Sequence, residues 1–121
     1  MYVDNERFML AIVEYKQFGR KKDYNLIATK FLKICHGLLI KPCFSDYSLD
    51  RQEDMISHAL ELMVKYLSNF RIDDDRPSDN PFSFFTRIAY NAFRQKLKYY
   101  KKLDKIYKSI DYVEMLENTA K

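Results

Sequence analysis

The sequence predicts an all-α protein: a compact bundle of about four helices whose last helix is long and basic. Only two glycines and three prolines occur in 121 residues, which leaves room for long uninterrupted elements. Apolar residues recur along these elements at spacings of three and four, as on one face of a helix. An apolar fraction of 47%, with 16% aromatic residues, is enough for a core and excludes a mostly disordered chain.

The first two helices are expected over about residues 5–18 and 23–39. Asp4 or Asn5 is a suitable N-terminal cap for the first helix, and Gly19 is a suitable end. Pro42 closes the second helix, and residues 41–47 are expected to form a loop. The residues expected to face the core from these two helices are Phe8, Met9, Ile12, Tyr15, Leu26, Ile27, Lys30, Phe31, Ile34 and Leu38.

The third helix is expected to begin near Ser48 and to end near Phe70, before a polar loop over residues 71–80. The fourth helix is expected to have Asn80 as its cap and Pro81 as its first residue, which is a favoured pairing. We expect it to end near residue 108. The first 108 residues then form one helical domain, and residues 109–121 a short amphipathic tail. The predicted buried face of the third helix is Ile56, Ala59, Leu60, Met63, Leu67 and Phe70.

The fourth helix separates aromatic and basic residues onto two faces. From residue 94 to residue 108 there are seven cations and one acid, Asp104. Cations can follow a phosphate backbone, and aromatic rings can stack on unpaired bases, so this helix is predicted to contact nucleic acid. Phe82, Ala89, Phe93 and Leu97 are expected to be mostly structural, whereas at least one of the three rings Phe84, Phe85 and Tyr90 is expected to be exposed.

Catalytic and metal-binding functions fit the sequence poorly. Cys35 and Cys43 are expected to be reduced, and their spacing from His36 and His58 matches no zinc finger. The aspartates of residues 73–79 lie in one polar loop, whereas catalytic carboxylates usually come from rigid elements. No nucleophile–base arrangement or glycine-rich phosphate loop is found. We therefore expect no catalytic residue, no metal, no cofactor, and a cytoplasmic protein without a membrane partner.

The order of motifs resembles that of bacterial sigma factors. Housekeeping members have a helix beginning D-L-I-Q-E-G, a loop, and a segment F-S-T-Y-A-x-W-W; here Asp54-Met55-Ile56 and Phe82-Ser83 occupy the corresponding starts. The likeness is greater to the late-transcription sigma factors of T-even-type bacteriophages. These share an N-P pair and an F-N-A-F segment ahead of a basic helix, here Asn80-Pro81 and Tyr90-Asn91-Ala92-Phe93.

The resemblance implies a protein that binds bacterial core RNA polymerase in an infected host cell and directs initiation at A·T-rich, TATA-like late promoters. In this family the third helix lies against a coiled coil on the largest polymerase subunit. Three of the implied contacts, Ser57, His58 and Leu60, depart from the housekeeping pattern. The full set of implied polymerase contacts is Asp54, Ser57, His58, Leu60, Glu61 and Val64.

The same resemblance implies that the fourth helix engages promoter DNA, both as duplex and as melted single strand. Phe85 would stack on a flipped base, and Ile88 and Ala89 occupy the place of a tryptophan pair. Asn91 and Gln95 carry amides that pair well with adenine. The implied DNA contacts are Phe82, Phe85, Arg87, Ile88, Tyr90, Asn91, Arg94, Gln95, Lys98, Lys101, Lys102 and Lys105.

The tail resembles the short motif by which the phage family is tethered to the replication sliding clamp. Ser109-Ile110-Asp111-Tyr112-Val113 stands in its place, so the implied clamp contacts are Ile110, Tyr112, Val113 and Leu116. The sliding clamp and a late co-activator are therefore further candidate partners. Alternatively, these residues simply complete a terminal amphipathic helix. For the whole protein, the alternatives are a helical DNA-binding accessory regulator and a sigma-mimicking polymerase inhibitor, neither with initiation activity.

Overall fold

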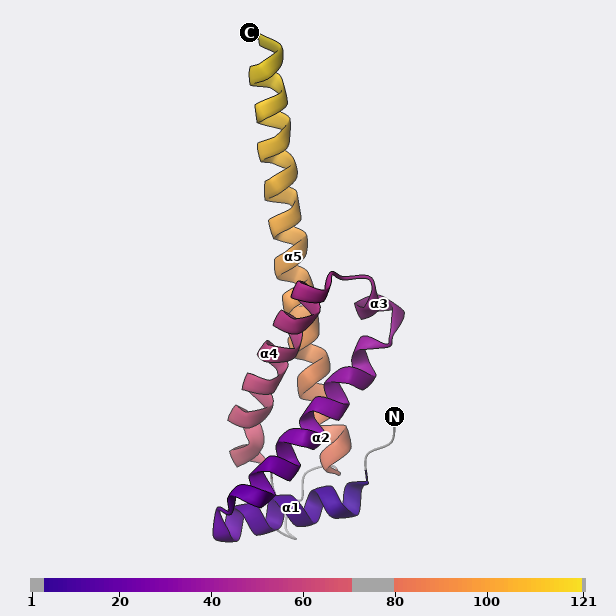
Figure 1. The fold of residues 1–121 in the computed structure, drawn as a ribbon, viewed down its shortest axis with the longest axis vertical. Coiled ribbons are helices and arrows are strands. Elements are labelled where there is room, and N and C mark those ends of the chain that lie inside the picture. Colours follow the sequence, from indigo (N-terminus) through magenta and orange to yellow (C-terminus); the bar gives the residue numbers. More distant parts are fainter. Residues whose placement is uncertain (1–3, 71–79, 121) are drawn as a thin grey trace.

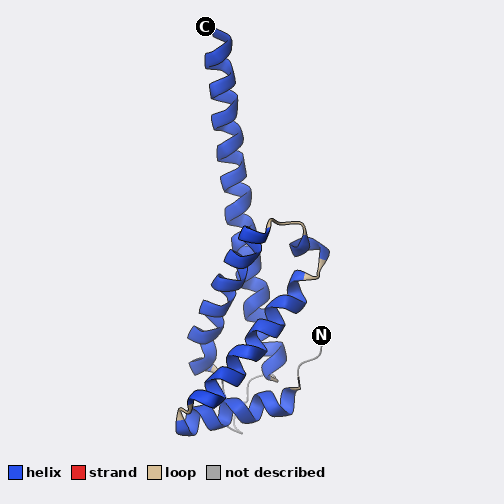
Figure 2. Cartoon of the chain, in the orientation of Figure 1, coloured by secondary structure: helices blue, strands red, loops and turns tan. Residues whose placement is uncertain are grey.

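The computed structural model describes residues 4–70 and 80–120, and over these residues the chain is helical and contains no strand (Figure 2). The all-α prediction is confirmed. The elements are α1 (Asn5–Phe18), α2 (Lys21–Leu39), α3 (Pro42–Ser45), α4 (Leu49–Tyr66), the 3₁₀ turn η1 (Leu67–Asn69) and α5 (Pro81–Ala120). In Figure 1, α2, α4 and the first half of α5 form the body, α1 crosses its lower end, and α5 continues far beyond it.

The starts of α1 and α4 follow from local capping interactions. Asp4 accepts hydrogen bonds from the backbone N–H groups of Glu6 and Arg7, at 3.0 and 3.4 Å. The hydroxyl of Ser48 accepts from the N–H of Arg51 at the start of α4. These bonds satisfy amide groups that have no partner within a helix. Gly19 ends α1 with a φ of 63°, a left-handed conformation that glycine adopts without a steric cost.

The start of α5 is tied to the start of α1. Asn80 caps its own helix by accepting from the N–H of Ser83 at 2.8 Å. The next amide, the N–H of Phe82, donates to the side-chain oxygen of Asn5 at 3.0 Å. Residues 77 positions apart therefore close the N-terminal end of the longest helix, and α1 is fixed across the base of the body.

An aromatic cluster fills the centre of the core. Phe85 of α5 lies 4.6 Å from Phe31 of α2, 5.7 Å from Phe8 of α1 and 5.7 Å from Phe70, measured between ring centroids. All four rings are at most 1% exposed. Offset and edge-to-face contacts of this kind stabilise aromatic clusters beyond the area that they bury. The four rings of this cluster thus come from α1, α2, α5 and the residue that follows η1.

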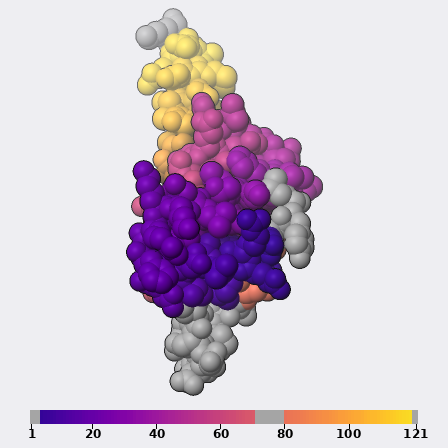
Figure 3. Space-filling model, turned by 60° about the horizontal axis from the view of Figure 1, so that its bottom comes forward, coloured from indigo at the N-terminus to yellow at the C-terminus, as the bar shows by residue number. Residues whose placement is uncertain are grey.

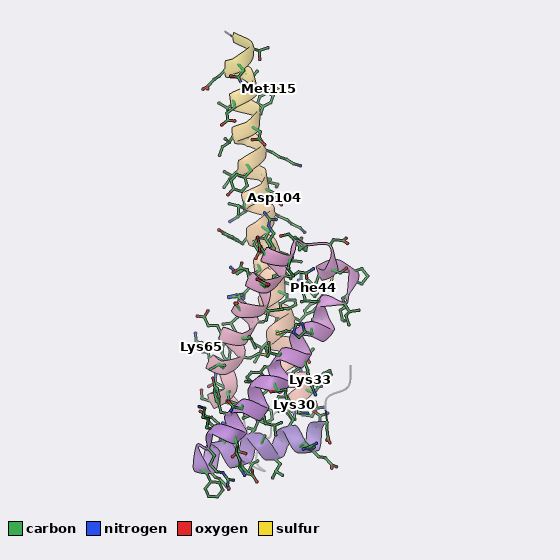
Figure 4. All side chains as sticks on the ribbon, in the orientation of Figure 1. Lys30, Lys33, Phe44, Lys65, Asp104 and Met115 are labelled. Atoms are coloured by element: carbon green, nitrogen blue, oxygen red, sulfur yellow. The ribbon has the colours of Figure 1, made fainter. Side chains whose placement is uncertain are left out.

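The expected loop over residues 41–47 contains a short helix, α3, that the sequence analysis did not predict. Pro42 occupies its first turn, where a missing N–H costs nothing. The turn carries Phe44 into the core, where its ring meets Phe93 at 5.1 Å and Tyr90 at 5.6 Å, both edge to face. Figure 4 labels Phe44 on α3, above the upper part of α2. Burial of this single ring explains why the connection is folded.

The last helix is longer than predicted. α5 has 40 residues, about 60 Å at 1.5 Å per residue, and it shows no break at residue 108. The last buried side chain in it is Tyr100. We call residues 101–120 the C-terminal arm; Leu103 is half-buried, and every other described side chain of the arm is exposed. Figure 3 shows the arm projecting from the packed body.

Candidate nucleic-acid interface

Exposed cations form a row along one side of α5. Arg94, Lys98, Lys101, Lys105 and Lys108 follow one another at spacings of four and three, and all five face solvent. The predicted contacts Arg87 and Lys102 are exposed beside this row. Asp104, the one acid in the run, is bound by Arg51 and does not interrupt the row. Such a row can follow a phosphate backbone over several nucleotides.

A groove between α4 and α5 runs beside the basic row. It has a volume of about 490 Å³ and combines rings with side-chain amides. Tyr66 is 37% exposed there, and Phe84 is half-buried, with its edge against Phe70. A flat apolar wall beside amide donors and acceptors is suited to an unstacked base. The lining residues are Leu62, Tyr66, Asn69, Phe84, Ile88, Asn91 and Gln95.

The groove shares two residues with a hollow that the basic row lines. Asn91 and Gln95 line the groove, and they also line a neighbouring hollow with Arg94, Lys98 and Lys101. A single strand lying along α5 could therefore place its phosphates on the cations and a base in the groove at the same time. The predicted contacts Asn91, Arg94, Gln95 and Lys98 are brought together here, and the half-buried Ile88 forms part of the groove floor.

Phe85 is not available to a base, so the prediction that it stacks on one is wrong for this structure. Its ring is 0% exposed. Four phenylalanines surround it, Phe84 among them at 4.9 Å. The helical phase explains the difference: residue 85 faces α1 and α2, whereas residue 84 lies 100° away and faces the groove. Phe84 is thus the ring of this pair that reaches the interface.

The other two predicted ring contacts are half-buried and lie away from the groove. Phe82 packs at the base of α5, where its N–H donates to Asn5. Tyr90 packs on Phe44, and the guanidinium of Arg94 lies 6.0 Å from its ring centroid. Tyr90 therefore borders the basic row on the side opposite the groove, and the structure does not bring it together with Asn91 or Gln95 in one pocket.

A second hollow, of about 280 Å³, lies on the α2 side of α5. Lys33 and Lys41 supply cations at this hollow, and Phe82 supplies a ring. The hydroxyl oxygen of Thr86 is buried there and has no hydrogen-bond partner among the described residues. A buried hydroxyl without a partner is costly, so this atom is suited to a polar group that enters from outside.

The predicted polymerase contacts divide into two groups on α4. Asp54, Ser57, Glu61 and Val64 are exposed and share one face of the helix. The structure does not place the other two in the same position: Leu60 is half-buried and packs against the core, and His58 turns toward α5. Nε2 of His58 lies 2.9 Å from Oε1 of Gln95. The exposed face of α4 therefore carries four of the six predicted polymerase contacts, and it is acidic.

Two residues near the start of α4, Arg51 and Asp54, make polar contacts with α5. Asp54 accepts a short hydrogen bond from the Tyr100 hydroxyl and lies 3.0 Å from the Lys96 ammonium. These two donors hold the pKa of the Asp54 carboxyl below its usual value, the Tyr100 bond being the larger cause. Arg51 donates two hydrogen bonds to Asp104, at 2.7 and 3.1 Å. Asp54 is thus partly engaged inside the molecule.

The predicted clamp contacts are exposed and helical. Ile110, Tyr112, Val113 and Leu116 are between 47% and 58% exposed on the arm. They do not share one face, because Tyr112 lies more than 90° around the helix from Val113. The reading of this segment as a terminal amphipathic helix agrees with its conformation here, and clamp binding stays a prediction.

The two cysteines are both free thiols, but one is buried and the other is exposed. Cys35 is 0% exposed, and burial raises its pKa to about 12, whereas Cys43 is exposed on α3. Within residues 4–70 and 80–120, no three metal-ligating side chains gather at one point. The aspartates of residues 73–79, considered above as a cation site, lie outside the described residues.

Four groove residues were not predicted as contacts: Leu62, Tyr66, Asn69 and Phe84. A signal for one of them was present. Phe84, Ile88, Asn91 and Gln95 recur at spacings of four, three and four, which is a stripe separate from that of Phe85. Tyr66 is the last residue of α4 and Asn69 the last residue of η1. Both enter the groove only because α4 and α5 pack side by side, so their role depended on the tertiary structure.

No protein-family model matches the chain, and no curated protein matches its sequence. None of the described helices combines the length and the apolar character needed to cross a lipid bilayer.

Proposed function

We propose that this protein is a sigma factor of the phage late type, which binds bacterial core RNA polymerase and directs initiation at A·T-rich promoters. One observation carries the proposal: the groove with its rings and amides adjoins the basic row of α5 through Asn91 and Gln95. A sigma factor must hold the backbone of a melted strand while accepting an unstacked base. The basic row supports the first requirement, and the groove between α4 and α5 supports the second.

In this proposal Phe84 and Tyr66 replace Phe85 as the stacking rings. A flipped base loses its neighbours in the stack, and a ring recovers about 1–3 kcal/mol of that loss per base. The amides of Asn91 and Gln95 favour adenine, because an amide forms two hydrogen bonds with its exposed edge. A·T-rich elements also open most readily, which suits a site without a tryptophan wedge.

Polymerase binding is assigned to the exposed acidic face of α4. Glu61 is exposed and makes no ion pair with any described residue. Asp54 is a weaker candidate than the resemblance implied, because Tyr100 and Lys96 already bind its carboxylate. An acidic face of this kind complements an arginine-rich coiled coil.

The test is transcription by bacterial core polymerase from a panel of A·T-rich promoters, with and without the protein. Defined start sites that appear only with the protein support the proposal. Tyr66→Ala should then reduce initiation about tenfold or more, because one stacking ring is lost. Tyr107→Ala removes an exposed ring from the arm, 54% exposed against 37% for Tyr66, and serves as its control.

A second experiment separates the alternatives. Glu61→Arg should abolish co-elution with core polymerase and leave DNA binding unchanged, and Asp46→Arg, an exposed acid outside α4, should alter neither. If wild-type protein binds DNA but never co-elutes with polymerase, the accessory-regulator alternative replaces the proposal. If it co-elutes but yields no defined transcript on any promoter, the inhibitor alternative replaces it.

A further inference from the structure

The C-terminal arm carries an apolar stripe that no described part of the body covers. Ile106, Ile110 and Val113 are 55%, 47% and 51% exposed, and with the half-buried Leu103 they recur at spacings of three, four and three. This repeat keeps apolar side chains on one seam and is typical of paired helices. Ile106, Ile110 and Val113 also line a shallow hollow on that side of the arm.

The apolar stripe begins at the point on α5 where α4 stops packing against it. Along the body α4 packs against α5, and its first turn is joined to the arm by the contact between Arg51 and Asp104. Figure 4 shows Asp104 on α5 just beyond the level where α4 starts, on the side of the C-terminus. Leu49, the first residue of α4, is 70% exposed at this boundary. An apolar surface therefore continues from the end of α4 along the arm.

The arm is also divided by charge. Its first half holds Lys101, Lys102, Lys105 and Lys108, whereas residues 109–119 hold Asp111, Glu114 and Glu117 and no cation. Two arms side by side in the same direction would bring like charges together. In opposite directions, the basic half of each arm lies along the acidic half of the other, which is favourable.

We propose that the apolar stripe is the binding surface for the arm of a second copy of this chain, paired in the antiparallel direction. The pair is two-fold symmetric, with Leu103 of one copy opposite Val113 of the second copy and Ile106 opposite Ile110. This register brings Glu117 near Lys102 of the second copy. The two bodies then lie at opposite ends of the pair, so they do not collide. The inference does not depend on the proposed function.

The seam spans residues 103–113, about one and a half heptads, so association is expected to be weak and concentration-dependent. Sedimentation velocity of the full chain at rising concentration should show a shift from monomer to dimer. Ile110→Asp places a charge in the seam and should weaken dimerisation roughly tenfold or more. Met115→Asp adds the same charge on the opposite side of the same helix, where Met115 is 58% exposed. This control substitution should change the strength of dimerisation little.

The direction of pairing can be read from disulfide formation. In a Cys43→Ser background, Leu103→Cys and Val113→Cys are prepared separately. If the arms pair in the antiparallel direction, a disulfide-linked dimer should form when the two variants are mixed and oxidised. Either variant oxidised alone should give little disulfide-linked dimer. A dimer from each variant alone indicates parallel arms and overturns the proposal. A protein that stays monomeric at every concentration, or equal effects of Ile110→Asp and Met115→Asp, overturns it as well.

Discussion

Nε2 of His58 lies 2.9 Å from Oε1 of Gln95, and this hydrogen bond joins α4 to α5 across the wall of the groove. The resemblance assigns His58 to polymerase binding and Gln95 to DNA binding. The bond fixes the amide of Gln95 through one lone pair of its oxygen, so the second lone pair and the NH₂ group stay available to a ligand. A side chain that the resemblance assigns to polymerase binding is therefore engaged by one that it assigns to DNA binding.

His58→Ala should loosen Gln95 and reduce the preference for adenine in the groove. The structural effect should be small, at most about 1 kcal/mol, because the pair is largely exposed. Binding of single-stranded oligonucleotides with and without adenine measures the preference. In a double-mutant cycle with Gln95→Ala, the two effects should not add. Additive losses would mean that the bond does not orient the amide.

Phe85→Ala should destabilise the fold by about 3–5 kcal/mol, because it empties the centre of the aromatic cluster. Urea denaturation measures this loss. Tyr66→Ala, which removes an exposed ring, should cost far less stability and instead weaken single-strand binding. A Phe85→Ala protein that is as stable as wild type but fails to bind single strands would restore Phe85 as a contact residue.

Thr86→Val should raise the free energy of unfolding by about 1 kcal/mol, because it removes a buried hydroxyl that has no partner among the described residues. Thr29→Val is the matched control: the Thr29 hydroxyl donates to the carbonyl of Asn25 at 2.9 Å and is exposed. If the α2-side hollow holds part of a nucleotide, Thr86→Val will weaken single-strand binding while it stabilises the protein. Destabilisation by Thr86→Val would show that the hydroxyl is satisfied in solution.

Asp54→Asn should lower the melting temperature at neutral pH, because the carboxylate is stabilised by Tyr100 and Lys96. A carboxyl whose pKa is lowered in the folded state stabilises the protein above its unfolded pKa, and this contribution is lost as pH falls through the folded value. The difference in melting temperature between wild type and Asp54→Asn should therefore shrink as pH falls through the acid range. A difference that is the same at all pH values would exclude the charge as its cause.

The basic row should give DNA binding a steep salt dependence. If its five cations each contact a phosphate, the logarithm of the binding constant falls with the logarithm of salt concentration at a slope of about −4 to −5. Lys101→Gln should reduce the magnitude of that slope by about 1. Lys22→Gln removes an exposed cation from the start of α2 and should leave the slope unchanged.

The helices were predictable because their signals are local. Asp4, Ser48 and Asn80 cap helices within a few residues of themselves, and the bounds of the first helix agree with the structure. The helix over Pro42–Ser45 was not predictable in this way, because it is held by the packing of Phe44 on Tyr90 and Phe93, far along the chain. The length of α5 was underestimated because no glycine or proline marks an end after residue 108.

The candidate site was predicted in part. The basic row needed only the spacing of cations on one helix, so its exposed side chains follow from the sequence. Choosing between Phe84 and Phe85 needed the direction from which α1 and α2 approach α5. Tyr66 and Asn69 enter the groove through the packing of two helices joined by the long connection over residues 71–79. Such contacts leave no local pattern, and the resemblance placed the ring one residue away.

The position of Tyr100 as the last buried side chain bears on the order of events during synthesis. The helices α1, α2 and α4 cannot bury their apolar faces fully until Phe85, Ala89 and Phe93 have been made, because these three residues belong to the same core. Growing chains that end before α5 expose the rings of Phe8, Phe31 and Phe70 to other proteins. Among the described residues, the arm adds no buried side chain after Tyr100, so the core needs nothing that is made later than Tyr100.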